Sequence, residues 1–195
     1  MVIVAGETGP AANWSLGGYA RPTSPELATR DIRYIKNATS CGAAMATSLP
    51  CIFSPLTRDS YSYEGRIGTE NLLDVLSPAG LKVESWDNNS GDNRVILAMH
   101  CMSDVGECLG EGGLYLHGTP WFMASEKQTH VPMVIWMSDR FRATLGLKEA
   151  CLTNQLEAPV THDNMFLTVI RLLDVTTEAR VPALGLAAEC RAKAS

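Results

Sequence analysis

The feature that most constrains the fold of this chain is a set of short runs of apolar residues. Runs that are mostly apolar on both faces are typical of strands in a sheet that helices cover on either side. They alternate with amphipathic stretches, so the sequence predicts an α/β fold in which a layered sheet is flanked by helices. Its 195 residues, 46% of them hydrophobic, are expected to form a single domain over 1–195 with a core of ordinary size. The runs are VIVA (2–5), IRYI (32–35), LKVESW (81–86), VILAMHCM (95–102) and VPMVIW (131–136).

Two of the amphipathic stretches are the clearest helices in the sequence. In residues 69–80, leucines and a valine recur at helical spacing until Pro78 and Gly80 end the pattern. In residues 162–175, apolar side chains share one side of the helix, and Thr161 is available as its cap. Both helices are expected to pack on the sheet.

Charge and hydropathy exclude several classes of function. The formal net charge is -5 and no lysines or arginines cluster, whereas a nucleic-acid surface needs a basic stripe to displace phosphate counterions. The longest apolar runs reach less than half of the roughly 20 residues that cross a bilayer. The chain opens directly on the apolar run 2–5, so we expect no signal or anchor of its own and a domain taken out of a longer protein.

Two carboxylates follow predicted strands, where α/β sheets place their ligand sites. Glu7 comes after VIVAG, and Asp104 comes after VILAMHCMS. Carboxylates at such positions are typical metal ligands or acid/base groups, and the plainer alternative is that each one caps a turn or a helix. SCGAAMA (40–46) places a glycine before a short helix whose free N–H groups could hold a phosphate, unless it is only a disulfide-tied turn.

Six cysteines are too few to define a disulfide scaffold in a chain of this length. Cys41 and Cys51 bracket a loop that could close as a short disulfide, and Cys151 and Cys190 bracket the C-terminal segment. This arrangement favours an oxidising compartment over the alternative that the cysteines are small buried hydrophobic residues.

Taken together, eight segments of the chain resemble the catalytic domain of lipid A phosphoethanolamine transferases, including the group that confers colistin resistance. The match runs in order from the first strand to about residue 175, and a set of this size is far more specific than any single motif. The segments are GET (6–8), AANWSLGGYARPTSPELA (11–28), TSCGAAMATSLPC (39–51), NLLDVL (71–76), DNNSG (87–91), SDVGECLGEGGLYLHGTP (103–120), QTHVP (128–132) and HDNMFLTVIRLLDV (162–175).

The resemblance implies an alkaline phosphatase-like or sulfatase-like fold at the periplasmic face of the bacterial inner membrane, with zinc as the cofactor. In this family a threonine takes phosphoethanolamine from phosphatidylethanolamine, and the enzyme passes it to a phosphate of lipid A. Zinc suits this step because it lowers the pKa of the hydroxyl and neutralises charge that develops on the phosphoryl oxygens. Phosphatidylethanolamine and lipid A are therefore the partners that the resemblance implies.

Carried over residue by residue, the family's site is incomplete in this sequence. Glu7 and Asp104 match two metal-ligand positions, but Met45 occupies the position of the nucleophilic threonine and Val105 that of a histidine ligand. A catalytic zinc site normally keeps three protein ligands, so two carboxylates alone would hold zinc poorly. Met45 and Val105 are both apolar and would fill a vacated polar pocket.

Neighbouring polar residues are not expected to replace these groups. Thr47 lies about 200° around the helix from Met45, and His100 is interpreted as a sheet-face or core histidine. Asn89 and Ser90 match a substrate-contacting stretch, and His117 matches a histidine linked to phosphate or a second metal. Two further histidines at family positions, His130 and His162, are explained by helix capping or by support of the site.

The second departure from the family is an internal truncation. By resemblance, about a hundred family residues are missing between 91 and 95. Parallel neighbouring strands need a crossover of about a dozen residues. We therefore expect 81–86 and 95–102 either to form a hairpin through a turn at 89–92 or to be separated by another strand.

Three functional hypotheses follow from these residues. The chain is an impaired but working transferase or a related phosphoesterase, a non-catalytic module that binds phosphate or lipid head groups, or a minimised scaffold without activity. The intact DNNS, YLHGTP and THDN stretches favour the first hypothesis, whereas Met45 and Val105 oppose it.

Overall fold

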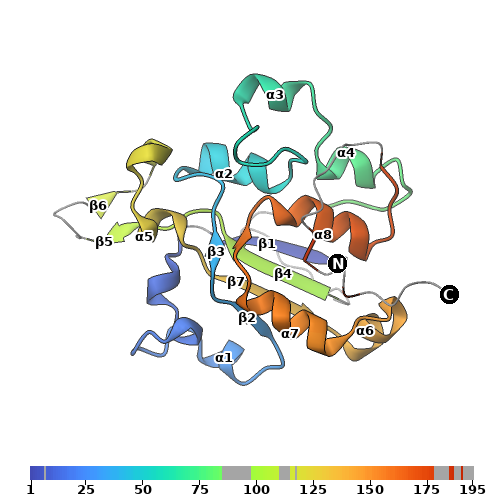
Figure 1. Cartoon of the computed structure of the whole chain (residues 1–195), viewed down its shortest axis with the longest axis horizontal. Helices are drawn as coiled ribbons and strands as arrows, with labels where there is room; N and C mark the ends of the chain where they lie inside the picture. Colours follow the sequence, from blue (N-terminus) through green and yellow to red (C-terminus); the bar gives the residue numbers. More distant parts are fainter. Residues whose placement is uncertain are drawn as a thin grey trace.

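A four-stranded sheet lies at the centre of the molecule, with strand order β1-β4-β7-β2 (Figure 1). This structure is a computed structural model, and it describes residues 1–6, 8–84, 98–109, 115–116, 118–177, 185–186 and 190. Two small sheets, β3-β8 and β5-β6, accompany the central one. The strands are β1 (Val2–Gly6), β2 (Arg33–Ile35), β3 (Ala38–Thr39), β4 (Ala98–Ser103), β5 (Cys108–Leu109), β6 (Tyr115–Leu116), β7 (Met133–Met137) and β8 (Val160–Thr161).

The central sheet is mixed. β1 and β4 are parallel neighbours, whose register runs from Val2 beside Met99 to Gly6 beside Ser103. β7 is antiparallel to β4, and β2 is antiparallel to β7. The carboxyl ends of β1 and β4 therefore meet at one edge of the sheet, where a ligand site is expected.

Helices flank this sheet, as the apolar strands predicted. In Figure 1, α2, α4 and α8 lie above the sheet in the view, and α6 and α7 lie below it. Leu152 of α7 and Thr168 of α8 line one cavity with Ile35 of β2, so these two helices pack on the same face of the sheet. None of the helices in the described part of the chain is both long and apolar enough to cross a membrane. The helices are α1 (Pro25–Ala28), α2 (Met45–Ile52), α3 (Tyr63–Ile67), α4 (Leu72–Leu76), α5 (Glu126–Thr129), α6 (Asp139–Leu145), α7 (Glu149–Glu157) and α8 (Asn164–Leu172), with 3-10 turns η1 (Ala11–Asn13), η2 (Ser15–Gly17) and η4 (Trp121–Met123).

One contiguous apolar core joins the helices to the sheet. Helix α8 is buried along nearly its whole length, and its Phe166 is 0% exposed. Ile35 and Met133 contribute the sheet side of the same core. Burial of this kind supplies most of the stability of short helices, which are marginal on their own in water.

Local sequence explains where individual helices begin and end. Asn71 caps α4, because its side chain accepts the N–H groups of Leu73 and Asp74, and the Asp74 carboxylate accepts the N–H of Asn71 in return. Ser138 caps α6 by accepting the N–H of Phe141. Gly146 ends α6 in the left-handed conformation, at φ 59°, which glycine adopts at little cost.

Several predictions from the sequence need correction. Residues 81–84 form no strand, and both edges of β4 are taken by β1 and β7, so a hairpin between 81–84 and β4 is wrong. Residues 85–97, with the predicted turn at 89–92, lie outside the described residues. Thr161 does not cap α8; it lies in β8 and its hydroxyl accepts the N–H of Asp163, which occupies the cap position.

Candidate active site

The candidate site lies where β1 and β4 end side by side. Beyond the last pair of the register, the Asp104 N–H still donates to the Gly6 carbonyl at 2.9 Å. The Ser103 hydroxyl accepts the N–H of Gly9 at 2.7 Å and donates to the Val105 carbonyl at 2.8 Å. These bonds tie the loop after β1 to the loop after β4.

Asp104 is buried, with 2% of its surface exposed, and binds backbone on both sides of the site. Its Oδ1 accepts the N–H of Val105 at 2.8 Å and the N–H of Thr8 at 3.0 Å. Thr8 has φ 45°, a left-handed conformation that is strained for a β-branched residue. In this structure the carboxylate thus serves as an acceptor that holds an unfavourable turn after β1.

The two apolar replacements lie in contrasting environments. Val105 is 0% exposed. The following residue, Gly106, donates its N–H to the Gln128 carbonyl at 2.8 Å, and a Cβ on Gly106 would lie 1.9 Å from the Lys127 carbonyl oxygen. Met45 is the first residue of α2 and is 41% exposed. Val105 therefore fills interior space, while Met45 lies exposed at the start of α2.

The N-terminus of α2 lies beside this edge of the sheet. No side chain caps it at Ala44, and Gly118 donates its N–H to the Ala43 carbonyl at 2.5 Å. One turn into the helix, the Ser48 hydroxyl donates to the Asp104 carbonyl. The backbone N–H groups at the start of α2 are therefore not capped by a side chain. The phosphate site that the sequence predicted at 40–46 stays a prediction.

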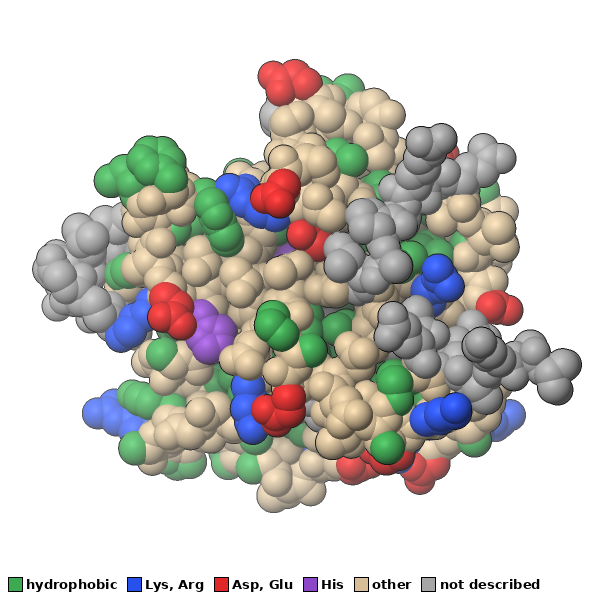
Figure 2. Space-filling model, in the orientation of Figure 1, with side chains coloured by type: hydrophobic (Ala, Val, Ile, Leu, Met, Phe, Trp, Pro, Cys, Tyr) green, Lys and Arg blue, Asp and Glu red, His purple; other side chains and the backbone are tan. Residues whose placement is uncertain are grey.

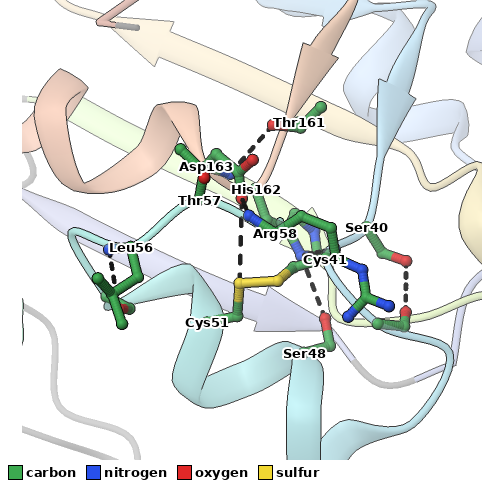
Figure 3. Close-up of a disulfide and its surroundings, with 12 residues drawn as sticks. Ser40, Cys41, Ser48, Cys51, Leu56, Thr57, Arg58, Thr161, His162 and Asp163 are labelled. Atoms are coloured by element: carbon green, nitrogen blue, oxygen red, sulfur yellow. Dashed lines mark hydrogen bonds between the residues drawn. A yellow bond between two sulfur atoms is a disulfide. The ribbon is translucent and has the colours of Figure 1, made fainter. Parts of the chain in front are cut away.

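The buried ring of His162 lies within hydrogen-bond distance of three segments of the site (Figure 3). Its Nε2–H donates to the Ser103 carbonyl at 3.1 Å, and its Nδ1 accepts the Cys41 N–H at 3.2 Å. The Ser48 hydroxyl also lies 3.1 Å from Nδ1. Burial lowers the pKa of His162 to about 4, because the interior disfavours the charged ring. His162 is thus a neutral histidine that supports the site. Support of the site was one of the two explanations that the sequence analysis gave for it.

Cys41 and Cys51 form the disulfide that the sequence predicted, and it joins the loop before α2 to the second turn of that helix. A second disulfide joins Cys151 to Cys190. In the described part of the chain, the group of three potential metal ligands consists of Cys41, Cys51 and Asp163. Because its two sulfur atoms are bonded to each other, this group is not a metal site.

Four predicted site residues, Glu7, Asn89, Ser90 and His117, lie outside the described residues. Of the remaining candidates, His130 lies away from Asp104, with its Nε2 2.6 Å from the Lys36 carbonyl. Ser48 and Ser103 were missed by the sequence reasoning. The signal available was weak: a serine one turn after Met45 on a short apolar helix, and a serine directly before Asp104.

The described residues do not fit a catalytic zinc ion. Asp104 Oδ1 accepts two backbone N–H groups, which orient the carboxylate and leave it at most one oxygen for an ion, and Val105 offers no donor atom. The Met45 thioether is a soft ligand that suits copper(I) better than zinc. The hydroxyl nearest to Asp104 on α2, that of Ser48, is fully buried and donates to the Asp104 backbone, so it is poorly placed to attack a substrate.

Comparison with known proteins gives a consistent set of relatives. The profile of the family described as Sulfatase matches residues 1–96 and 94–175. Phosphoethanolamine transferase EptA of Salmonella typhimurium is 25% identical over 306 residues, covering 97% of this chain and 56% of the relative. Phosphatidylethanolamine transferase Mcr-1 of Escherichia coli is 41% identical over 97 residues, covering 49% of this chain and 18% of the relative.

A solved structure extends the similarity to the fold. The soluble domain of lipooligosaccharide phosphoethanolamine transferase A from Neisseria meningitidis superposes with a TM-score of 0.87 at 26% identity, covering 98% of this chain and 92% of that one. The sulfatase-like layered fold expected from the sequence is thereby confirmed. The chain spans about half the length of the full-length EptA that it matches.

Proposed function

We propose that this chain, which belongs to the sulfatase family and is a relative of the phosphoethanolamine transferases, keeps their scaffold without zinc-dependent transfer. The observation that carries the proposal is Val105, which is 0% exposed where the resemblance expects a histidine ligand. Among the described histidine side chains, His162 uses both ring nitrogens in hydrogen bonds and His130 binds the Lys36 carbonyl, so neither replaces the missing imidazole.

The ancestral reaction follows from the names of the relatives. One is a phosphatidylethanolamine transferase, and another is a Kdo(2)-lipid A phosphoethanolamine 7''-transferase. We infer that phosphatidylethanolamine and lipid A were the lipids of that reaction in the line leading to this chain. Glu7 and Asp104 would be what remains of the zinc site, and Asn89, Ser90 and His117 what remains of the substrate contacts.

An oxidising compartment is the setting we propose for the chain. The chain contains the disulfides Cys41–Cys51 and Cys151–Cys190. Disulfide bonds persist in the periplasm and outside the cell rather than in a reducing cytosol. Related solved domains are described as periplasmic. The periplasmic face of the bacterial inner membrane is therefore the proposed location.

The proposal includes an internal truncation. The family profile matches in two pieces that meet at residues 94–96, and the alignment with EptA extends over 306 residues against a chain of 195. Both facts support the loss of about a hundred family residues between 91 and 95, with further parts of the substrate site in the lost segment.

Zinc content and turnover, measured together, test the proposal. The purified chain is analysed for bound zinc by mass spectrometry and is assayed for phosphoethanolamine release from a soluble fluorescent phospholipid analogue. We expect background zinc and no release. The variant Met45→Thr/Val105→His is expected to raise zinc affinity at least about tenfold, because it restores an imidazole and a hydroxyl.

The control variant Met45→Ala/Val105→Asn changes the same positions without adding an imidazole, and it should leave zinc at background. Stoichiometric zinc with release by the unaltered chain would overturn the proposal. Background zinc in a folded Met45→Thr/Val105→His variant would show that the site is misplaced. If the change at buried Val105 prevents folding, Met45→Thr alone is assayed instead, because Met45 is exposed. This variant should release no phosphoethanolamine.

A further inference from the structure

Two apolar side chains protrude from the molecule at the 3-10 turn η4. Phe122 is 85% exposed and Met123 is 66% exposed. Together with Trp121 they form what we call the apolar tip (Trp121–Met123). Figure 2 shows hydrophobic side chains gathered at the end of the segment that Figure 1 draws in yellow before α5. Apolar side chains exposed to this extent and adjacent in sequence are typical of contact surfaces.

The apolar tip is held against the loop that follows α2. The guanidinium carbon of Arg58 lies 4.3 Å from the centre of the Trp121 ring, a cation–π contact. The backbone of Arg58 is held in turn, since its main-chain N–H donates to the Asp163 carboxylate at 2.9 Å. Phe122 and Met123 therefore project from an anchored base.

The 3-10 turn pairs part of the backbone of the apolar tip. The Met123 N–H donates to the Pro120 carbonyl at 2.9 Å, and the Ala124 N–H donates to the Trp121 carbonyl at 3.1 Å. Backbone groups without a partner are costly to move into a low-dielectric medium, so the side chains, rather than the backbone, are the part of this turn that can leave water.

The charges beside the apolar tip indicate what it meets. Arg58 contacts the tip, and the exposed Asp59 follows it in the sequence, so this segment carries one positive and one negative charge, as a zwitterionic lipid head group does. The net charge of -5 disfavours an anionic surface. A protruding tip also needs a matching groove in a protein partner, whereas a bilayer interface deforms around it.

We propose that the apolar tip inserts into the interface of a zwitterionic bilayer, with Phe122 and Met123 at the acyl boundary and Arg58 among lipid phosphates. Aromatic and long apolar side chains beside a cation are the groups that partition into this region. The contact does not require transfer chemistry, so it stands apart from the zinc and release measurements above.

Vesicle flotation tests the contact. The full chain is mixed with vesicles of phosphatidylethanolamine and phosphatidylcholine, and bound protein is measured after flotation. The variant Phe122→Ser/Met123→Ser is expected to lower the partition coefficient at least about tenfold, because it removes the apolar surface that would enter the interface. Ile67→Ser is the matched control, because Ile67 is 73% exposed on α3 and should leave partitioning unchanged.

Three results would overturn the proposal. The unaltered chain does not float with the vesicles, or the tip variant floats as well as the unaltered chain. Alternatively, analytical ultracentrifugation shows a dimer that the tip variant dissociates, while vesicle binding is the same for both, which would make the tip a contact between two copies of this chain.

Discussion

Among the individual residues, His162 shows most directly how polar chemistry stabilises this site. Its neutral ring donates to the end of β4 and accepts from the loop that precedes α2. The unfolded chain binds a proton on this ring near pH 6.5, and the folded chain binds one only near pH 4. Unfolding therefore takes up a proton between these values, and stability must fall as the pH drops through that window.

The predicted size of this effect is up to roughly 3 kcal/mol of unfolding free energy between pH 6.5 and pH 4. Denaturant unfolding at several pH values measures it. His162→Gln should flatten the dependence in that window and lower stability at pH 7 by about 1–3 kcal/mol, because the Cys41 N–H loses its acceptor.

The difference in pH dependence between the unaltered chain and the His162→Gln variant separates the contribution of His162 from that of other titratable groups. Asp163 acts in the opposite direction, since burial raises its pKa and favours the folded state as the pH falls. An identical pH dependence in the His162→Gln variant would mean that the histidine does not titrate in this way.

At the level of elements, the Cys41–Cys51 disulfide fixes the loop before α2 against that helix. The bond closes a loop with a sequence separation of 10 residues. In the loop-entropy account, Cys41→Ala/Cys51→Ala should lower stability by about 3 kcal/mol. Cys151→Ala/Cys190→Ala removes a disulfide that closes a loop with a sequence separation of 39 residues, and it should lower the free energy of unfolding by about 4 kcal/mol.

Denaturant unfolding of both double variants, with and without reductant, checks this prediction. Reductant should destabilise each variant only through the disulfide that it still contains. A Cys41→Ala/Cys51→Ala variant as stable as the unaltered chain would indicate that hydrogen bonds of the loop, rather than the disulfide, hold α2 in place.

The same elements show what the sequence could and could not predict. The strands at 2–5 and 32–35 were recognisable because they are short apolar runs, even though Val4 in the first is 38% exposed. β7 differs from its prediction only in its ends. Residues 81–84 have the same kind of composition but lie outside the sheet, since β1 and β7 already occupy both edges of β4. Which strands pair is decided by the whole sheet, and composition does not contain that information.

The site was predictable to a similar extent. Asp104 directly follows β4, as the sequence predicted, and its role as a metal ligand stays a prediction. Its engagement with the N–H groups of Thr8 and Val105 depends on a turn with a left-handed threonine, for which the sequence gives no signal. Ser48 and Ser103 were missed because isolated serines are too common to be assigned a role without coordinates.

For the molecule as a whole, the continuity of the core implies that the described parts unfold together. Phe166 on α8, Ile35 on β2 and Leu72 on α4 belong to one apolar cluster that spans the sheet and the helices. No described segment has a separate core that would let it unfold alone. A single cooperative transition is therefore expected, as for most domains of this size.

Phe166→Ala is the variant that tests this cooperativity. Phe166 is 0% exposed, and its removal should cost about 3–5 kcal/mol, because it leaves a cavity between α8 and the sheet. The midpoints measured by far-ultraviolet circular dichroism and by tryptophan fluorescence should shift together. Separate transitions for the two signals, or a shift in only one of them, would mean that parts of the core are stabilised independently and that the chain does not behave as one domain.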